Sequence, residues 1–229
     1  MKKAEAPLII AIDGPAGAGK STVAKAIARR LKIAYLDTGA MYRALTLKAL
    51  NTKTKLDDQD ALVALARKTK IEVKEDPSSG LVVLLDGKDV SKEIRTVEVT
   101  NNTFYIARAE KVRAVMVEWQ RAIGRTQSLV AEGRDIGTVV FPHANYKFYL
   151  DAELEERSHR RLKELAESGK IIDAGQLKAE LKDRDHKDSS RTTGPLKKAE
   201  DAVVIDSTHL TAEQVVQTIL KHIEARVRT

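Results

Sequence analysis

The sequence contains no cysteine, few aromatic residues and no long apolar segment among its 229 residues. Without cysteine, the chain can form neither disulfides nor zinc–thiolate sites and has no thiol nucleophile, a composition typical of a reducing compartment. No stretch approaches the roughly 20 apolar residues of a membrane-spanning helix. The opening segment MKKAEAPLII lacks the apolar core of a signal peptide. We therefore expect a cytoplasmic protein that does not bind a membrane.

The formal net charge of +7 favours an acidic partner or substrate. Aromatic residues make up only 4% of the chain, too few for a base-stacking platform, and the basic residues are interleaved with 33 acidic ones. We therefore expect phosphorylated small molecules, and not nucleic acid, to account for the positive charge. We also expect a monomer.

The most informative stretch follows the first apolar run and reads GPAGAGKST, which fits the pattern G-x-x-x-x-G-K-[ST]. A predicted strand precedes it and a predicted helix follows it. Glycine lets the backbone adopt positive φ angles, so that successive N–H groups can surround an anion. The alternative is a turn without a ligand, which gives no reason for a lysine and a hydroxyl to follow the last glycine. We predict that the phosphates of ATP are bound by Gly14, Pro15, Ala16, Gly17, Ala18, Gly19, Lys20, Ser21 and Thr22.

Two side chains of this P-loop have distinct predicted roles. Lys20 can reach the β- and γ-phosphates as a point charge, and the Ser21 hydroxyl can ligate Mg²⁺. The helix that begins at Ser21 adds the positive end of its dipole. We therefore expect Mg²⁺ as the cofactor, bound together with the phosphates of ATP.

Five short apolar segments alternate with amphipathic helical patterns. This alternation predicts a parallel sheet covered by helices on both faces, that is, an α/β three-layer P-loop NTPase fold with a five-stranded parallel core sheet. The expected strands span residues 8–12, 33–36, 128–131, 146–150 and 202–206.

Two regions depart from the alternation. Short strand patterns within residues 71–95, with a turn at PSSG (77–80) and a hairpin signal at Asp86-Gly87, predict a small antiparallel β insertion. The highly charged residues 153–195 predict a helical hairpin, either a solvated surface feature or a mobile lid whose arginines close over phosphates. We favour the lid, because a hairpin with few aliphatic anchors is weakly held.

Local patterns leave some roles open. Residues 37–39 are expected to form a turn at a strand end, where open α/β sheets bind ligands. Thr38 and Arg43 are therefore candidate ligand contacts, with a helix N-cap and a surface arginine as the alternatives. Helix is predicted from Glu98 to Arg125, and Arg113 within it is solvated or contacts a ligand. The segment IGTVVFPHA (136–144), which follows Asp135, is predicted to be a loop.

Taken together, these segments resemble those of the bacterial cytidylate kinases, which are P-loop nucleoside monophosphate kinases. The resemblance covers nearly the whole chain and implies transfer of the γ-phosphoryl group of ATP to CMP or dCMP, giving CDP or dCDP plus ADP. The transfer would be Mg²⁺-dependent and in line, without a general base. Beyond the P-loop, the resemblance rests on LDTGAMYR (36–43), DGKDVSKEIRT (86–96), EGRDIGTVVFP (132–142), EERSHRR (155–161), RDHKDSSR (184–191) and VIDST (204–208).

The resemblance also implies roles for individual residues. One departure concerns Phe104, where the family commonly has a serine near the base; if the neighbouring Thr103 cannot substitute, preference for cytosine over uracil is weakened. Catalytic roles would belong to Lys20, Arg134, Arg157 and Arg160, with Arg161 also in the lid. The CMP contacts would be Thr38, Arg43, Arg113, Arg134, Asp135, Arg184, Asp188 and Arg191.

The same resemblance divides the chain into parts of a single P-loop kinase unit, residues 1–229. These parts are a core (about 1–40, 125–152 and 196–229), an NMP-binding region that contains the β insertion (about 41–124) and a lid (about 153–195).

Other P-loop proteins are the alternatives. A kinase for another nucleotide or a small alcohol would not explain the hairpin insertion or RDHKDSSR. A GTPase needs a guanine-reading N-K-x-D pattern, which the sequence lacks. A nucleic-acid-associated ATPase should bind in a strongly salt-dependent way and be stimulated by polynucleotide.

Overall fold

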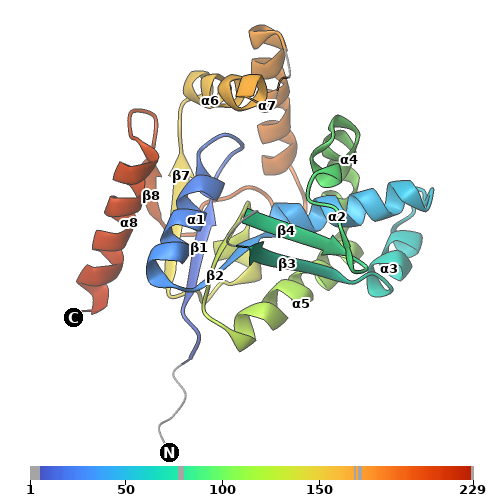
Figure 1. Ribbon diagram of the computed structural model, residues 1–229, viewed down its shortest axis with the longest axis horizontal. Helices are drawn as coiled ribbons and strands as arrows, with labels where there is room; N and C mark the ends of the chain where they lie inside the picture. Colours follow the sequence, from blue (N-terminus) through green and yellow to red (C-terminus); the bar gives the residue numbers. More distant parts are fainter. Residues whose placement is uncertain (1–5, 77–79, 168, 170–171, 228–229) are drawn as a thin grey trace, which may run out of the picture. The chain divides into compact units, whose positions relative to one another are not determined.

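The computed structural model (Figure 1) describes residues 6–76, 80–167, 169 and 172–227. The chain forms two compact units. One unit, here called the middle unit, comprises Ala34–Leu129 with the N-terminal segment that ends at Pro7. The other, the P-loop unit, comprises Leu8–Ile33 and Val130–Thr229. The predicted division into core, NMP-binding region and lid stays a prediction.

A five-stranded sheet has the strand order β2-β6-β1-β7-β8. Strand β1 pairs in parallel with β7, and β7 pairs in parallel with β8. The predicted α/β fold with a five-stranded parallel sheet is therefore confirmed. The strands are β1 (Ile9–Asp13), β2 (Ala34–Asp37), β6 (Leu129–Gly133), β7 (Tyr146–Asp151) and β8 (Val203–Asp206).

Burial explains why these strands form where they do. Every residue of β1 and of β6 is buried, as expected for strands covered on both faces, which are continuous apolar runs in the sequence. Within the P-loop unit, helix α1 (Lys20–Leu31) contacts helix α8 (Ala212–Val227). Val23 and Ile27 of α1 and Val216 and Ile219 of α8 are buried, so the spacing of apolar residues matches the helical period.

The middle unit contains the predicted antiparallel insertion. Its sheet has the order β3-β4-β5 with antiparallel pairing, and Asp86 and Gly87 have φ angles of 51° and 85°, as in a tight hairpin turn. The predicted turn at PSSG falls largely on residues 77–79, outside the described residues. The strands are β3 (Ile71–Asp76), β4 (Gly80–Leu85) and β5 (Lys88–Asp89). The helices are α2 (Thr38–Asn51), α3 (Gln59–Arg67), α4 (Val97–Arg108) and α5 (Glu110–Thr126), with a 3₁₀ turn at Glu93–Arg95.

The charged region after β7 forms the predicted helical hairpin, which belongs to the P-loop unit. Its helices are α6 (Leu154–Glu167) and α7 (Ala174–Ser189). Leu177 and Leu181 of α7 are buried in one cluster with Ala16 of the P-loop. The hairpin therefore has apolar anchors on the loop itself. Partly buried side chains packed against this cluster are Leu154, Leu162, Leu165 and Ile172.

Three local predictions need correction. The helical stretch from Glu98 to Arg125 is broken at Ala109, whose extended backbone (φ −72°, ψ 104°) separates α4 from α5. The predicted turn at residues 37–39 is instead the start of α2, and Asp37 is its N-cap, because its carboxylate accepts a hydrogen bond from the Ala40 N–H at 2.8 Å. The segment predicted as a loop after Asp135 contains a π-helical turn, Ile136–Val140.

No helix in the described part of the chain is both long enough and apolar enough to cross a membrane.

Gly14 offers a test of the packing between β1 and β7. Its φ is 149°, and a Cβ added there would lie 2.0 Å from the carbonyl oxygen of Leu150. We expect Gly14→Ala to lower the free energy of unfolding by at least about 3 kcal/mol, because backbone must move to admit the methyl group. Gly87→Ala is the matched control, since Gly87 also has positive φ but nothing lies within 4 Å of its added Cβ. Its cost should be about 1 kcal/mol, and urea denaturation measures both. Equal losses would contradict the packing argument.

Candidate active site

The P-loop joins β1 to α1 in a conformation that requires glycine. Gly14, Gly17 and Gly19 have φ angles of 149°, 80° and 87°. A Cβ at Gly17 would lie 3.0 Å from the carbonyl oxygen of Arg157, so this glycine also permits close approach of α6. Gly19 is the N-cap of α1 and offers no side-chain oxygen to the first N–H groups. The helix end is therefore available to an anionic ligand.

Lys20 is buried and folded over its own loop. Its Nζ donates a hydrogen bond to the carbonyl oxygen of Pro15 at 2.6 Å. Burial lowers the pKa of Lys20 to about 7, and the positive charge of Arg134 acts in the same direction. Glu132 and Asp13 oppose the shift only partly. A phosphate group beside Lys20 would supply the missing negative charge.

The Ser21 and Thr22 side chains are exposed at the start of α1. Among the described residues, no group of three or more His, Asp or Glu side chains could hold a metal ion. Mg²⁺ is commonly bound through one or two protein ligands together with substrate phosphates and waters. The exposed Ser21 hydroxyl could be one such protein ligand.

Arg134, Asp188 and Arg191 meet in the P-loop unit. Arg134 Nε donates to Asp188 Oδ2 at 2.7 Å, and Arg191 Nη2 donates to the other carboxylate oxygen. Burial alone would raise the pKa of Asp188, but the charges of Arg134, Arg191 and Arg184 hold it below its usual value. This cluster gathers four residues that were predicted to contact CMP, and its positive charges outnumber its negative ones. They are Arg134, Arg184, Asp188 and Arg191.

Asp13 has no predicted role, yet it is one of the most constrained side chains of this region. Its carboxylate accepts hydrogen bonds from the N–H groups of Ile136 at 2.8 Å and Gly137 at 2.7 Å. Burial raises its pKa to about 6. The sequence did contain a signal for Asp13, because it lies at the end of a buried strand. The same criterion selected residues 37–39 as candidates.

Arg157 connects α6 to the P-loop. Its Nε donates to the Ala152 carbonyl at 2.9 Å, and its Nη1 donates to the Ala16 carbonyl at 3.1 Å and to Asp185 Oδ2 at 2.6 Å. The structure therefore places this predicted lid arginine against the backbone of the loop. Asp185 lies within RDHKDSSR, but sequence analysis gave it no role.

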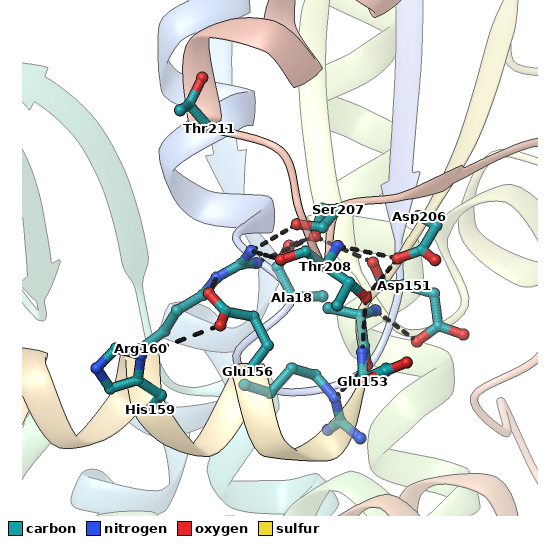
Figure 2. A network of polar contacts seen from close by, with 12 residues as sticks. Ala18, Asp151, Glu153, Glu156, His159, Arg160, Asp206, Ser207, Thr208 and Thr211 are labelled. Carbon is teal, nitrogen blue, oxygen red and sulfur yellow. Dashed lines mark hydrogen bonds and ion pairs between the residues drawn. The ribbon is translucent and has the colours of Figure 1, made fainter.

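Arg160 lies at the centre of a second network (Figure 2). Its guanidinium donates to Ser207 Oγ at 3.1 Å and to the Ser207 carbonyl at 2.5 Å, and its Nε donates to Glu156 at 2.9 Å. Ser207 Oγ in turn donates to the carbonyl of Ala18 at 3.2 Å. The VIDST segment thus links α6 to the P-loop. Arg161, by contrast, is exposed and pairs with Glu164.

Of the other four predicted CMP contacts, Asp135 is buried in the P-loop unit at the start of the π-helical turn, and three lie in the middle unit. Thr38 is buried as the first residue of α2. Arg43 Nη1 donates to Thr100 Oγ1 at 2.8 Å. Arg113 is only 2% exposed, and its guanidinium carbon lies 5.6 Å from the centroid of the Tyr42 ring. The solvated alternative for Arg113 is therefore wrong, and so is Thr38 as the N-cap of α2.

The Asp188 cluster should contribute strongly to stability. We expect Asp188→Ala to lower the free energy of unfolding by about 3 to 5 kcal/mol, because it removes the carboxylate that two largely buried guanidinium groups contact. Asp183→Ala is the matched control on the same helix, since Asp183 pairs with Lys187 at 2.6 Å while both side chains are about half exposed. Its cost should be below about 1 kcal/mol. Chemical denaturation at pH 7 measures both, and similar losses would contradict the role assigned to the cluster.

Comparisons with known proteins agree on one family. The cytidylate kinase family model matches residues 10–225. The cytidylate kinase of Desulforamulus reducens is 51% identical over 215 residues, which cover 94% of this chain and 96% of that protein. The cytidylate kinase of Geobacillus sp. (strain WCH70) is 50% identical over 218 residues, which cover 95% and 97%. An uncharacterized protein from Eubacterium ventriosum shares the fold, with a TM-score of 0.53 at 14% identity over 95% of this chain and 98% of its own.

Proposed function

The chain belongs to the cytidylate kinase family, and from this premise we propose that it transfers the γ-phosphoryl group of ATP to CMP or dCMP. The products are ADP and CDP or dCDP. The observation that carries the proposal is the match of the family over residues 10–225, which includes the P-loop and the arginine-rich segments together. The resemblance predicted from the sequence is thereby confirmed.

The reaction requires that two anions approach each other closely. Unit charges 4 Å apart repel by about 4 kcal/mol at an effective dielectric constant near 20. Lys20 on the donor side and Arg134 on the acceptor side offset this repulsion. No general base is needed, because the attacking phosphate oxygen of CMP is already ionised at neutral pH. In-line positioning and stabilisation of the transferred group therefore carry the catalysis.

The ATP phosphates would lie in the loop from Gly14 to Thr22, and the Ser21 hydroxyl would help to hold Mg²⁺. Mg²⁺ supplies charge neutralisation at the β- and γ-phosphates when bound. The positive φ angles of the loop and the exposed Ser21 support this assignment.

The contacts to the acceptor CMP are likewise proposed from the resemblance to the family. Arg43 and Arg134 hold the CMP phosphate, with Thr38 beside it. Support comes from the hydrogen bonds that hold the partly buried Arg43 and Arg134 side chains, to Thr100 and Asp188 respectively. The ribose and base contacts we propose are Arg113, Asp135, Arg184, Asp188 and Arg191.

Arg157 and Arg160 are proposed to stabilise charge on the transferred phosphoryl group, to which a single arginine can contribute on the order of 10³ to 10⁵ in rate. Both lie on α6, and both are linked to the P-loop by hydrogen bonds, Arg160 through Ser207. Closure of α6 and α7 over the phosphates would exclude water, the competing acceptor. We further propose that the protein is cytoplasmic, since its substrates are cytoplasmic nucleotides. We also propose that it is a monomer.

The acceptor specificity is the sharpest test of this function. In a coupled assay for ADP formation, we expect rapid turnover with CMP and dCMP, slower turnover with UMP and little with AMP. The Thr103 hydroxyl is already bonded to the Val99 carbonyl at 2.7 Å, so it is poorly placed to replace a serine at Phe104. We therefore expect UMP to be a measurable substrate. Brisk turnover of another acceptor without turnover of CMP would overturn the proposed function.

ATP binding should be coupled to proton uptake by Lys20. Since the pKa of Lys20 is about 7 without a ligand, the side chain is mostly neutral at pH 8. Phosphate groups favour its charged form, so MgATP binding at pH 8 should take up close to one proton. Calorimetry in two buffers of different ionisation enthalpy measures the uptake. Lys20→Arg is the control, because arginine stays protonated and should abolish it. Equal uptake by both proteins would refute the role of Lys20.

A further inference from the structure

The carboxylate of Asp13 joins two segments that are far apart in the sequence. Asp13 ends β1 and directly precedes the P-loop, whereas its donors Ile136 and Gly137 follow Arg134 and Asp135. Both carboxylate oxygens are used, and the side chain is only 4% exposed. One buried group therefore fixes the start of the P-loop relative to the turn after Arg134.

The two donors are the first N–H groups of the π-helical turn. The turn's own bonds begin later, where the N–H groups of Val139 and Val140 donate to the Asp135 carbonyl at 2.8 and 3.1 Å. The Asp135 side chain makes no capping hydrogen bond. Asp13 therefore supplies the cap, and a carboxylate at this end of a helical turn is electrostatically favourable.

Arg134 is thereby constrained at both ends. Its guanidinium donates to Asp188 at 2.7 Å and to the Gly133 carbonyl at 3.2 Å. Its backbone lies two residues before the first N–H that Asp13 binds. A shift of the turn would move the Arg134 backbone while Asp188 retains its head group.

We propose that Asp13 is a positioning residue for phosphoryl transfer, which sets Arg134 relative to the P-loop by capping the turn at Ile136 and Gly137. The inference rests on the proposed function, in which the P-loop holds the donor phosphates and Arg134 the acceptor phosphate. Asp13 acts through these groups without contacting substrate. A misplacement of about 1 Å in such a site can cost on the order of 100-fold in rate.

A carboxylate is required in this role because it can accept two hydrogen bonds without donating one. Charged or titratable groups face it from each neighbouring element: Lys20 from α1, Asp135 after β6, and Tyr149 and Lys147 from β7. Burial dominates their effects and raises the pKa of Asp13 to about 6, so the carboxylate is ionised at pH 8. An amide of the same shape would direct an N–H group at one of the two backbone donors.

Steady-state kinetics of Asp13→Asn at pH 8 provide the test, with the acceptor that the wild-type enzyme phosphorylates. We expect kcat to fall by about 100-fold and the KM for the acceptor to rise, while the KM for ATP stays within about twofold of wild type. Asp58→Asn is the matched control, since Asp58 caps α3 through the Ala61 N–H at 2.9 Å and has no part in the site. Its kinetic constants should be those of wild type.

The outcomes separate positioning from simple stabilisation. A lower thermal midpoint with unchanged kinetic constants for folded Asp13→Asn would overturn the proposal, as would equal changes in both KM values. Absence of CMP turnover by the wild-type enzyme would instead refute the proposed function. In that case, Asp13→Asn would still be compared with the wild-type enzyme, using whichever acceptor the wild-type enzyme phosphorylates.

A second measurement needs no variant. In a ¹⁵N–¹H correlation spectrum of the wild-type protein, the amide protons of Ile136 and Gly137 should shift together with a midpoint near pH 6, because both are bonded to the Asp13 carboxylate. The Ala61 amide, bonded to the exposed Asp58, should not titrate with this midpoint. Rapid deuterium exchange of both the Ile136 and Gly137 amide protons, as for amides without a hydrogen-bond acceptor, would overturn the proposal even if Asp13→Asn did not fold.

Discussion

Buried positive charge in excess of nearby negative charge is the constraint on which the P-loop unit depends. Lys20 loses affinity for its proton because it is buried and because Arg134 and Arg184 lie near it. Asp188 offsets part of this charge by binding Arg134 and Arg191 at once. The protein thus keeps a set of cations in place at a cost to its own stability, and anionic substrates relieve that cost when they bind.

The parts of the fold that local sequence determines were predictable. Apolar runs gave the core strands, and the Asp86-Gly87 turn gave the hairpin, because burial and positive φ leave direct signals in residue type. The break at Ala109 leaves no such signal, since neither glycine nor proline marks it. The burial of Arg113 could not be predicted either. The sequence pattern of a helix is the same whether its arginine faces solvent or packs against a tyrosine ring, as Arg113 does.

In the candidate site, too, some residues could be predicted from local sequence and others could not. The P-loop is contiguous, so its residues could be identified together. Asp13 could be noticed as the end of a buried strand, but its role could not be predicted, because its hydrogen-bond partners are backbone amides 123 and 124 residues away, which carry no side-chain identity. Ser207 was missed for a related reason, because the possible acceptors of its hydroxyl proton are the backbone carbonyls of Ala18 and Asp151. Contacts between a side chain and a distant backbone need the fold before they can be recognised.

The carbonyl groups of the P-loop have a consequence for its chemistry. Lys20 donates to the Pro15 carbonyl, Arg157 to that of Ala16, and Ser207 to that of Ala18. Each of these carbonyls belongs to a peptide unit whose N–H is that of the next residue. A hydrogen bond at the oxygen polarises the peptide and strengthens its N–H as a donor, by about 10–30%. The side chains that bind these carbonyls therefore also tune the acidity of the backbone amides of the loop.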